Sequence, residues 1–269
     1  TIDKYGHNLT SVVMPGAGFR IQHDLNKLNI SDWMVNLGVT HETEVYGQFA
    51  AHMTQSDELN GSSYRKRQGI VPDFMIFTGT FTRTLAELKT VHQCRARYTN
   101  RTIRERNGAV NRRADKIHAE YLNKASQADE KYNGWVRGGG GWGPLRTAVE
   151  GFGRIQGLAV GPRGSVSKDL DKLIATIAQI GAERKWQMMG ARNPLEARAV
   201  IKGRLRRSVG ITAVVAEAML RSDRLGITLG NGSRAARRRK EAKTWFWRWR
   251  DEMFRQGAPV GGAYWPNYG

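Results

Sequence analysis

The stretch IVPDFMIFTGTFTRTLAELKTV, residues 70–91, decides the fold because it contains two apolar segments, each interrupted by charge at one place. Asp73 interrupts the first segment, and Glu87 and Lys89 interrupt the second. The Thr/Gly residues between the segments predict two strands joined as a hairpin. Ionised groups are poorly tolerated inside apolar strands unless they are paired or hold a metal, so these three residues need a reason to be there.

The predicted hairpin brings the charged residues together. Side chains alternate between the faces of a strand, so Glu87 and Lys89 share one face and Leu88 lies on the other. If the strands pair through a turn at 78–83, Asp73 lies near Glu87, with a lysine beside the two acids. Hard divalent cations such as Mg²⁺ prefer sites of this kind, made of oxygen ligands and rich in carboxylates.

The charge of the chain points to a polyanionic partner. Its 269 residues, enough for a large domain with a real core, include 43 Lys and Arg against 24 Asp and Glu, a net charge of +19. Nucleic acid is the commonest partner for such a protein, because each neutralised phosphate releases counterions. The alternatives are that the charge only keeps the chain in solution or docks it on ribosomal RNA or an acidic membrane.

The cysteine content and the hydropathy of the sequence indicate the type of cellular compartment and the absence of a membrane-spanning segment that we expect. The single cysteine, Cys94, excludes an internal disulfide and favours a reducing, intracellular compartment, with the nucleus as one option. No apolar run approaches the ~18 residues needed to cross a bilayer, so we expect a soluble chain without a membrane partner. The sequence begins at Thr1 without a signal segment, which suggests a processed chain or one piece of a longer one.

The hydrophobic pattern predicts an α/β protein. The predicted elements are a helix over 23–37, or two short helices divided at Ser31, a strand over 41–49, strands over 70–77 and 84–91, one or two helices over 101–132, a strand over 154–160, a helix over 167–180 capped by Ser167, and a helical region over 194–225. The glycine-rich run 138–144 cannot form regular structure and marks a joint.

The Pro72-Asp73 and Glu87-Leu88-Lys89 motifs, with thirteen residues between Asp73 and Glu87, resemble the signature of the PD-(D/E)XK nuclease superfamily. This superfamily includes restriction endonucleases, exonucleases and Holliday-junction resolvases. The chain also looks like basic proteins of protist mobile elements, in which a strand ending Leu-Ala-Glu-Leu-Lys precedes an Arg-rich helix and a later Gly-rich strand. The match covers roughly 23–100 and extends weakly to 180.

The resemblance implies a restriction-endonuclease-like core, with the order helix, three strands, helix, strand and a mixed four-stranded sheet flanked by helices. The implied organisation is an irregular segment over 1–22, a nuclease-like core over 23–180 with the joint at 138–144, a basic helical extension over 181–256, and a disordered tail over 257–269.

The resemblance also implies the chemistry. Asp73, Glu87 and the backbone carbonyl of Leu88 would hold Mg²⁺ or Mn²⁺, and Lys89 would position or activate the attacking water. A cross-strand salt bridge between Lys89 and Asp73 or Glu87 is the structural alternative.

Many members have a further acid on the first helix. The candidates here are Asp24 and, less favoured, Asp32. Glu42 and Glu44 on the first strand are two more, and alternation places both on one face.

Two basic segments are expected to bind nucleic acid. The helix after the third strand often borders the active site in this superfamily, and guanidinium groups suit phosphate oxygens. The first segment contains Arg95, Arg97, Arg101, Arg104, Arg106, Arg112 and Arg113 against a single acid, Glu105. A solvated helix face is the alternative.

The second basic segment, 233–256, contains Arg237, Arg238, Arg239 and Lys240, followed by Trp245, Phe246, Trp247 and Trp249. The basic cluster would clamp phosphates or serve as a nuclear-localisation-like patch, whereas the aromatic residues stack on bases or pack on the core.

We therefore expect a Mg²⁺-dependent nuclease that hydrolyses phosphodiester bonds of DNA by in-line attack, with an endonuclease favoured over an exonuclease. Whether a homodimer is needed to cut two strands stays open. The alternatives are a non-catalytic nucleic-acid-binding or ribonucleoprotein component, supported by charge alone, and a membrane-surface protein anchored by the Trp/Arg segment.

Overall fold

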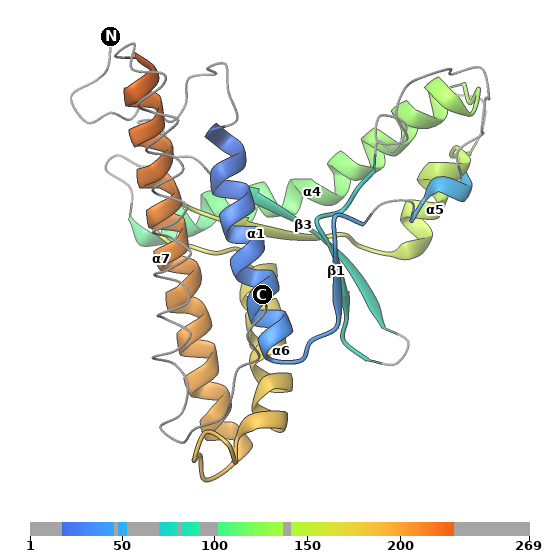
Figure 1. The fold of residues 1–269 in the computed structure, drawn as a ribbon. Coiled ribbons are helices and arrows are strands. Elements are labelled where there is room, and N and C mark those ends of the chain that lie inside the picture. Colours follow the sequence, from blue (N-terminus) through green and yellow to red (C-terminus); the bar gives the residue numbers. More distant parts are fainter. Residues whose placement is uncertain are drawn as a thin grey trace, which may run out of the picture.

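The computed structural model describes residues 18–45, 48–52, 70–79, 82–91, 102–136 and 141–228. In these residues a four-stranded sheet lies between helices (Figure 1). The expectations for Cys94, for the basic cluster at 237–240 and for the tail at 257–269 lie outside the described residues.

The elements follow the predicted order, with additions. They are α1 (Gly18–Asn36), β1 (His41–Thr43), the short 3-10 helix η2 (Ala50–His52), β2 (Phe74–Phe77), β3 (Arg83–Thr90), α4 (Ile103–Tyr132), α5 (Pro144–Phe152), β4 (Gln156–Val160), α6 (Lys168–Lys185) and α7 (Pro194–Thr228). α1 passes through Ser31 without a break and begins at Gly18, so the irregular segment predicted through residue 22 is wrong for 18–22.

The sheet is mixed and open, with the strand order β1-β2-β3-β4. β2 pairs with both β1 and β3 in antiparallel orientation, whereas β3 and β4 are parallel. A parallel pair needs a crossover connection, and the chain between these strands contains α4 and α5. The predicted α/β class, with a mixed four-stranded sheet flanked by helices, is confirmed.

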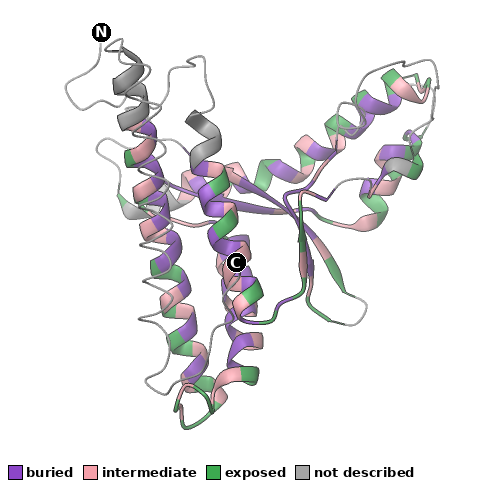
Figure 2. Cartoon of the chain, in the orientation of Figure 1, coloured by how far each residue is buried: buried purple, intermediate pink, exposed green. Residues whose placement is uncertain are grey.

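β3 lies between two hydrophobic clusters, and its buried residues are visible in Figure 2. Ala86 and Leu88 belong to the cluster that contains residues of α1, α6 and α7, whereas Leu85 belongs to the cluster with α4 and α5. All three side chains are at most 1% exposed. The predicted alternation along this strand is therefore confirmed, and it places Glu87 on the same face as Leu85, towards α4.

The first strand is much shorter than the predicted 41–49. Glu44 has a φ of 52°, outside the β region, so regular strand geometry ends after Thr43. The backbone still follows the neighbouring segment, because the amides of Glu44 and Val45 donate to the carbonyl oxygens of Asp73 and Pro72 at 3.1 and 3.0 Å.

The prediction that 138–144 contains no regular structure is wrong at Pro144, which is the first residue of α5. Proline fits the first turn of a helix because its missing N–H would have no partner there. The buried carboxylate of Asp129 caps this helix end, because it accepts from the amides of Leu145 and Arg146, each at 2.9 Å. Gly143 leaves room for that carboxylate.

α7 shares one hydrophobic core with the sheet. Ile201, Leu205 and Val209 of α7 belong to the same cluster as Leu158 of β4. The boundary predicted at residue 180 falls inside α6, which continues to Lys185. None of the helices in the described ranges, α7 included, has the length and apolar character needed to cross a membrane.

Candidate active site

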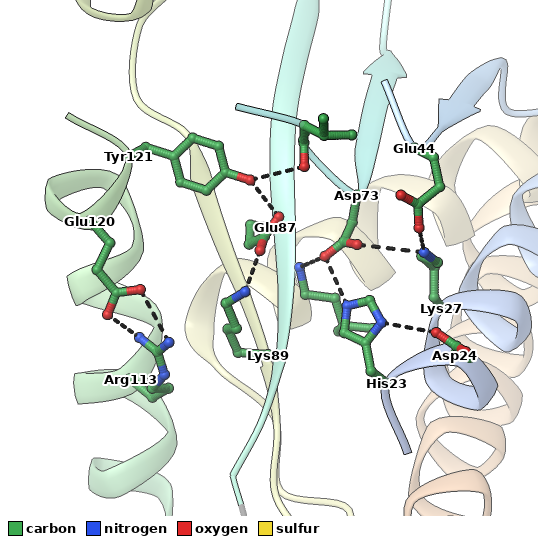
Figure 3. A network of polar contacts seen from close by, with 12 residues as sticks. His23, Asp24, Lys27, Glu44, Asp73, Glu87, Lys89, Arg113, Glu120 and Tyr121 are labelled. Carbon is green, nitrogen blue, oxygen red and sulfur yellow. Dashed lines mark hydrogen bonds and ion pairs between the residues drawn. The ribbon is translucent and has the colours of Figure 1, made fainter. Parts of the chain in front are cut away.

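The two predicted acidic segments lie side by side in the sheet. Phe74 pairs with Ala86, so the antiparallel register places Asp73 opposite Glu87. Asp73 lies at a bend directly before β2, and its Oδ2 accepts a hydrogen bond of 2.8 Å from the backbone amide of Leu88. The central residue of the Glu87-Leu88-Lys89 motif therefore holds the Asp73 carboxylate beside β3 (Figure 3).

Helix α1 supplies two cationic partners of Asp73. The His23 Nε2 atom lies 3.0 Å from Asp73 Oδ2, and the Lys27 Nζ atom lies 3.6 Å from Oδ1. His23 also lies 3.3 Å from Asp24, through its Nδ1 atom. Lys27 forms a second ion pair with Glu44, so one ammonium group joins α1 to both segments (Figure 3).

Glu87 is held at both carboxylate oxygens. Its Oε1 atom pairs with the ammonium group of Lys89, two residues along the same strand. Its Oε2 atom accepts a 2.6 Å hydrogen bond from the Tyr121 hydroxyl on α4. Burial, together with the charge of Glu87 and the hydrogen bond to it, raises the pKa of Tyr121 far above its usual value, so the hydroxyl stays protonated and donates.

The two acids are buried, whereas the lysine is partly exposed. Asp73 and Glu87 are each 6% exposed, whereas the Lys89 side chain is 27% exposed. Buried carboxylates are tolerated when they are paired and hydrogen-bonded, as both are here. Lys89 pairs with Glu87 within β3, whereas Asp73 pairs with α1, so the ion pair of Lys89 is not the cross-strand salt bridge of the structural alternative.

The pKa values of His23 and Asp73 move apart. Burial lowers the pKa of His23, but the hydrogen bond and charge of Asp73 and the hydrogen bond of Asp24 more than offset it, so the pKa rises above 6.5. Burial raises the pKa of Asp73. The opposing effects are larger: the hydrogen bond and charge of His23, the hydrogen bond from the Leu88 amide and the charge of Lys27 all lower this pKa, so the net shift is downward from 3.8.

These shifts give the pair a pH window. The stabilisation of the folded state by charged His23 is complete below its unfolded pKa of about 6.5 and is lost as the pH rises through the higher folded pKa. The stabilisation of the folded state by ionised Asp73 is complete above its unfolded pKa of about 3.8 and is lost as the pH falls through the lower folded pKa. In EDTA, we expect His23→Gln to lower the free energy of unfolding by about 1–2 kcal/mol near pH 5.5 and by much less near pH 9.

Urea unfolding at both pH values measures this difference. His52→Gln is the control, because His52 is an exposed histidine of η2, and it is expected to change stability equally little at both pH values. An equal loss for His23→Gln at both pH values would contradict the assignment of charge to this pair.

The four further acids are placed differently. Asp24 and Glu44 each share a cationic partner with Asp73, through His23 and Lys27 respectively. Glu42 is exposed on β1 and pairs in register with Met75. Asp32 lies eight residues after Asp24 on α1, about 12 Å along the helix axis. Because Glu44 departs from strand geometry, the prediction that alternation places it with Glu42 fails.

Few of the predicted nucleic-acid contacts fall on described side chains. Arg112 is exposed on α4. Arg113 donates to Glu120 with both terminal nitrogens, at 2.5 and 3.1 Å, so its guanidinium group already has an internal partner. The other predicted contacts lie outside the described side chains; they are Arg95, Arg97, Arg101, Arg104, Arg106, Arg237, Arg238, Arg239 and Lys240.

The oxygen atoms of the two acids and of the neighbouring backbone are the kind of ligand that a hard divalent cation prefers. Within the described residues, no group of three or more His, Cys, Asp and Glu side chains is arranged to hold a metal. Mg²⁺, however, commonly uses one or two carboxylates together with water and substrate phosphates. Asp73 and Glu87 with the carbonyl of Leu88 provide such an all-oxygen set on adjoining segments.

Three residues of this network were not predicted as site residues: His23, Lys27 and Tyr121. Tyr121 lies in the helical region predicted over 101–132, and it is 2% exposed. Its spacing from Ile117, one helical turn, indicates burial but does not reveal a hydrogen bond to a strand.

Comparison of the chain with protein-family models, with curated proteins and with solved structures finds no match.

Proposed function

We propose that the chain is a Mg²⁺-dependent nuclease that hydrolyses phosphodiester bonds of DNA and has a PD-(D/E)XK, restriction-endonuclease-like core. The observation that carries the proposal is the 2.8 Å hydrogen bond between the Asp73 carboxylate and the amide of Leu88. It joins the two halves of the signature, which lie on different segments of the chain.

The order of elements supports the proposal. A helix, three antiparallel strands, a helical crossover and a fourth, parallel strand form the described core. This is the order that the resemblance implies, with Asp73 directly before the second strand and Glu87 on the third.

Asp73, Glu87 and the Leu88 carbonyl would hold the cation, which when bound polarises a phosphate and lowers the pKa of water. Lys89 is partly exposed, more so than the two acids, and its ammonium group orients the attacking water and offsets negative charge on the phosphate. The water loses a proton to solvent as its oxygen forms a bond to phosphorus, the opposite P–O bond breaks, and the leaving oxygen takes a proton from solvent.

The substrate follows from charge and from the resemblance. The net charge of +19 favours a polyanion, and the exposed Arg112 lies on the helix that carries Tyr121. DNA is preferred to RNA because most proteins of the resembled superfamily act on it.

Cleavage of plasmid and single-stranded DNA in Mg²⁺ or Mn²⁺ tests the proposal. We expect cleavage by the wild-type protein, none in EDTA, and a loss of about a hundredfold in Lys89→Met, because positioned groups of this kind contribute about 10²–10⁴-fold. Lys172→Met is the matched control, because Lys172 is an exposed lysine on α6. DNA binding without cleavage in either metal would instead support a non-catalytic nucleic-acid-binding protein.

A further inference from the structure

One buried hydroxyl contacts both segments that carry the acids. Tyr121 Oη lies 2.6 Å from Glu87 Oε2 on β3 and 3.3 Å from the carbonyl oxygen of Val71, two residues before Asp73. A tyrosine hydroxyl has a single proton, and the shorter contact assigns it to Glu87. A single side chain of α4 therefore reaches both halves of the site (Figure 3).

Packing fixes the ring that carries this hydroxyl. Tyr121 is 2% exposed and belongs to the hydrophobic cluster that contains Ile117 and Ala125, its neighbours one turn away on α4. Lys124 places its Nζ atom 5.1 Å from the ring centroid. The hydroxyl has little freedom to leave Glu87, because the ring cannot move without disturbing the cluster.

The hydroxyl also determines how Glu87 is presented. Glu87 has several rotatable bonds, and its Oε1 atom already pairs with Lys89 on the same strand. Without a donor at Oε2, Lys89 would be the remaining partner of the Glu87 carboxylate among the described side chains, and lysine has a flexible stem that is partly exposed here. The contact with Tyr121 is what ties the carboxylate to the rigid side of the site.

We propose that Tyr121 is a positioning residue that holds the Glu87 carboxylate in the orientation in which it binds a divalent cation with Asp73. This inference rests on the proposed function. Hydrogen-bond partners that orient metal ligands typically change metal affinity or activity by about 10–100-fold when they are removed. Tyr121 acts through Glu87 and needs no contact with the substrate.

Tyr121→Phe tests the inference, since it keeps the ring and removes only the hydroxyl. We expect the Kd for Mn²⁺, measured by titration calorimetry on the full chain without DNA, to rise by about 10–100-fold. Cleavage should fall at low metal and recover at saturating metal, with KM for DNA unchanged. Tyr132→Phe is the matched control, because Tyr132 lies against the same cluster on α4; it should bind Mn²⁺ like the wild type.

A second variant separates positioning from packing. 4-Aminophenylalanine at position 121 keeps a donor at the same place, and it should restore Mn²⁺ affinity to within about threefold of the wild type if the donor is what matters. This rescue also decides the question if Tyr121→Phe does not fold, as judged by circular dichroism.

The outcomes distinguish the two proposals. Wild-type Mn²⁺ affinity in folded Tyr121→Phe overturns the inference and leaves the proposed function standing. A loss of cleavage in Tyr121→Phe that saturating metal does not rescue also overturns the inference. Failure of the wild-type protein both to bind metal and to cleave DNA overturns the proposed function, and the inference with it.

Discussion

Replacing Asp73 by asparagine is expected to reduce the rate of DNA cleavage by about a thousandfold, because about 4 kcal/mol of transition-state stabilisation corresponds to that factor. Asparagine keeps an oxygen that accepts from the Leu88 amide, so the bend before β2 should persist. It removes the negative charge that the cation needs, and it leaves His23 and Lys27 facing a neutral group.

Single-turnover cleavage at saturating Mg²⁺ measures this effect. Asp115→Asn is the matched control, because Asp115 is 70% exposed on α4 and contacts Arg154 at 3.8 Å. The control should cleave like the wild type, and Asp73→Asn should bind DNA at least as tightly as the wild type because it removes a negative charge. A folded Asp73→Asn protein that retains cleavage within tenfold of the wild type would contradict the assignment of Asp73 as a ligand of the cation.

The second large effect concerns the fold. Gly157 lies in β4 where α4 crosses the sheet, and a Cβ atom added there would lie 2.2 Å from the carbonyl oxygen of Ala114. The carbonyl carbon and Cα of Ala114 would each be at 2.7 Å, so the obstacle is backbone and cannot rotate away. We expect Gly157→Ala to lower the free energy of unfolding by about 3 kcal/mol, at the upper end of typical overpacking costs.

Chemical denaturation measures this loss, and Gly203→Ala provides the opposite case. Gly203 is an exposed residue of α7 with open space around it, so alanine there should raise the free energy of unfolding by about 0.5–1 kcal/mol. Similar stability of the Gly157→Ala variant and the wild type would contradict the close approach of the α4 backbone at Ala114 to Gly157 of β4.

The core of the fold could be predicted because its signals are local. Alternation along 84–90 decides which β3 side chains enter each cluster, and the serine before α6 predicts its start, since Ser167 Oγ accepts from the Leu170 amide. The length of β1 was overestimated because the spacing of apolar residues does not reveal the positive φ of Glu44. α5 was missed because its cap, Asp129, belongs to another helix.

The partners of the acids could not be predicted for a similar reason. His23 and Asp73 are 50 residues apart, and Tyr121 and Glu87 are 34 apart. Whether they meet depends on how α1 and α4 pack on the sheet, and no short-range pattern contains that information. The two motif halves could be paired in advance only because a hairpin connects them.

The parallel pairing of β3 with β4 also sets the order of assembly. Ala86 pairs with Gln156, some 70 residues later, whereas the partners within the β2–β3 hairpin are close neighbours in sequence. Closing so long a loop costs entropy before any contact is gained, and topologies rich in such contacts fold slowly. During synthesis the β2–β3 hairpin leaves the ribosome before β4, so the edge of β3 that pairs with β4 has no strand partner until β4 has emerged and docked.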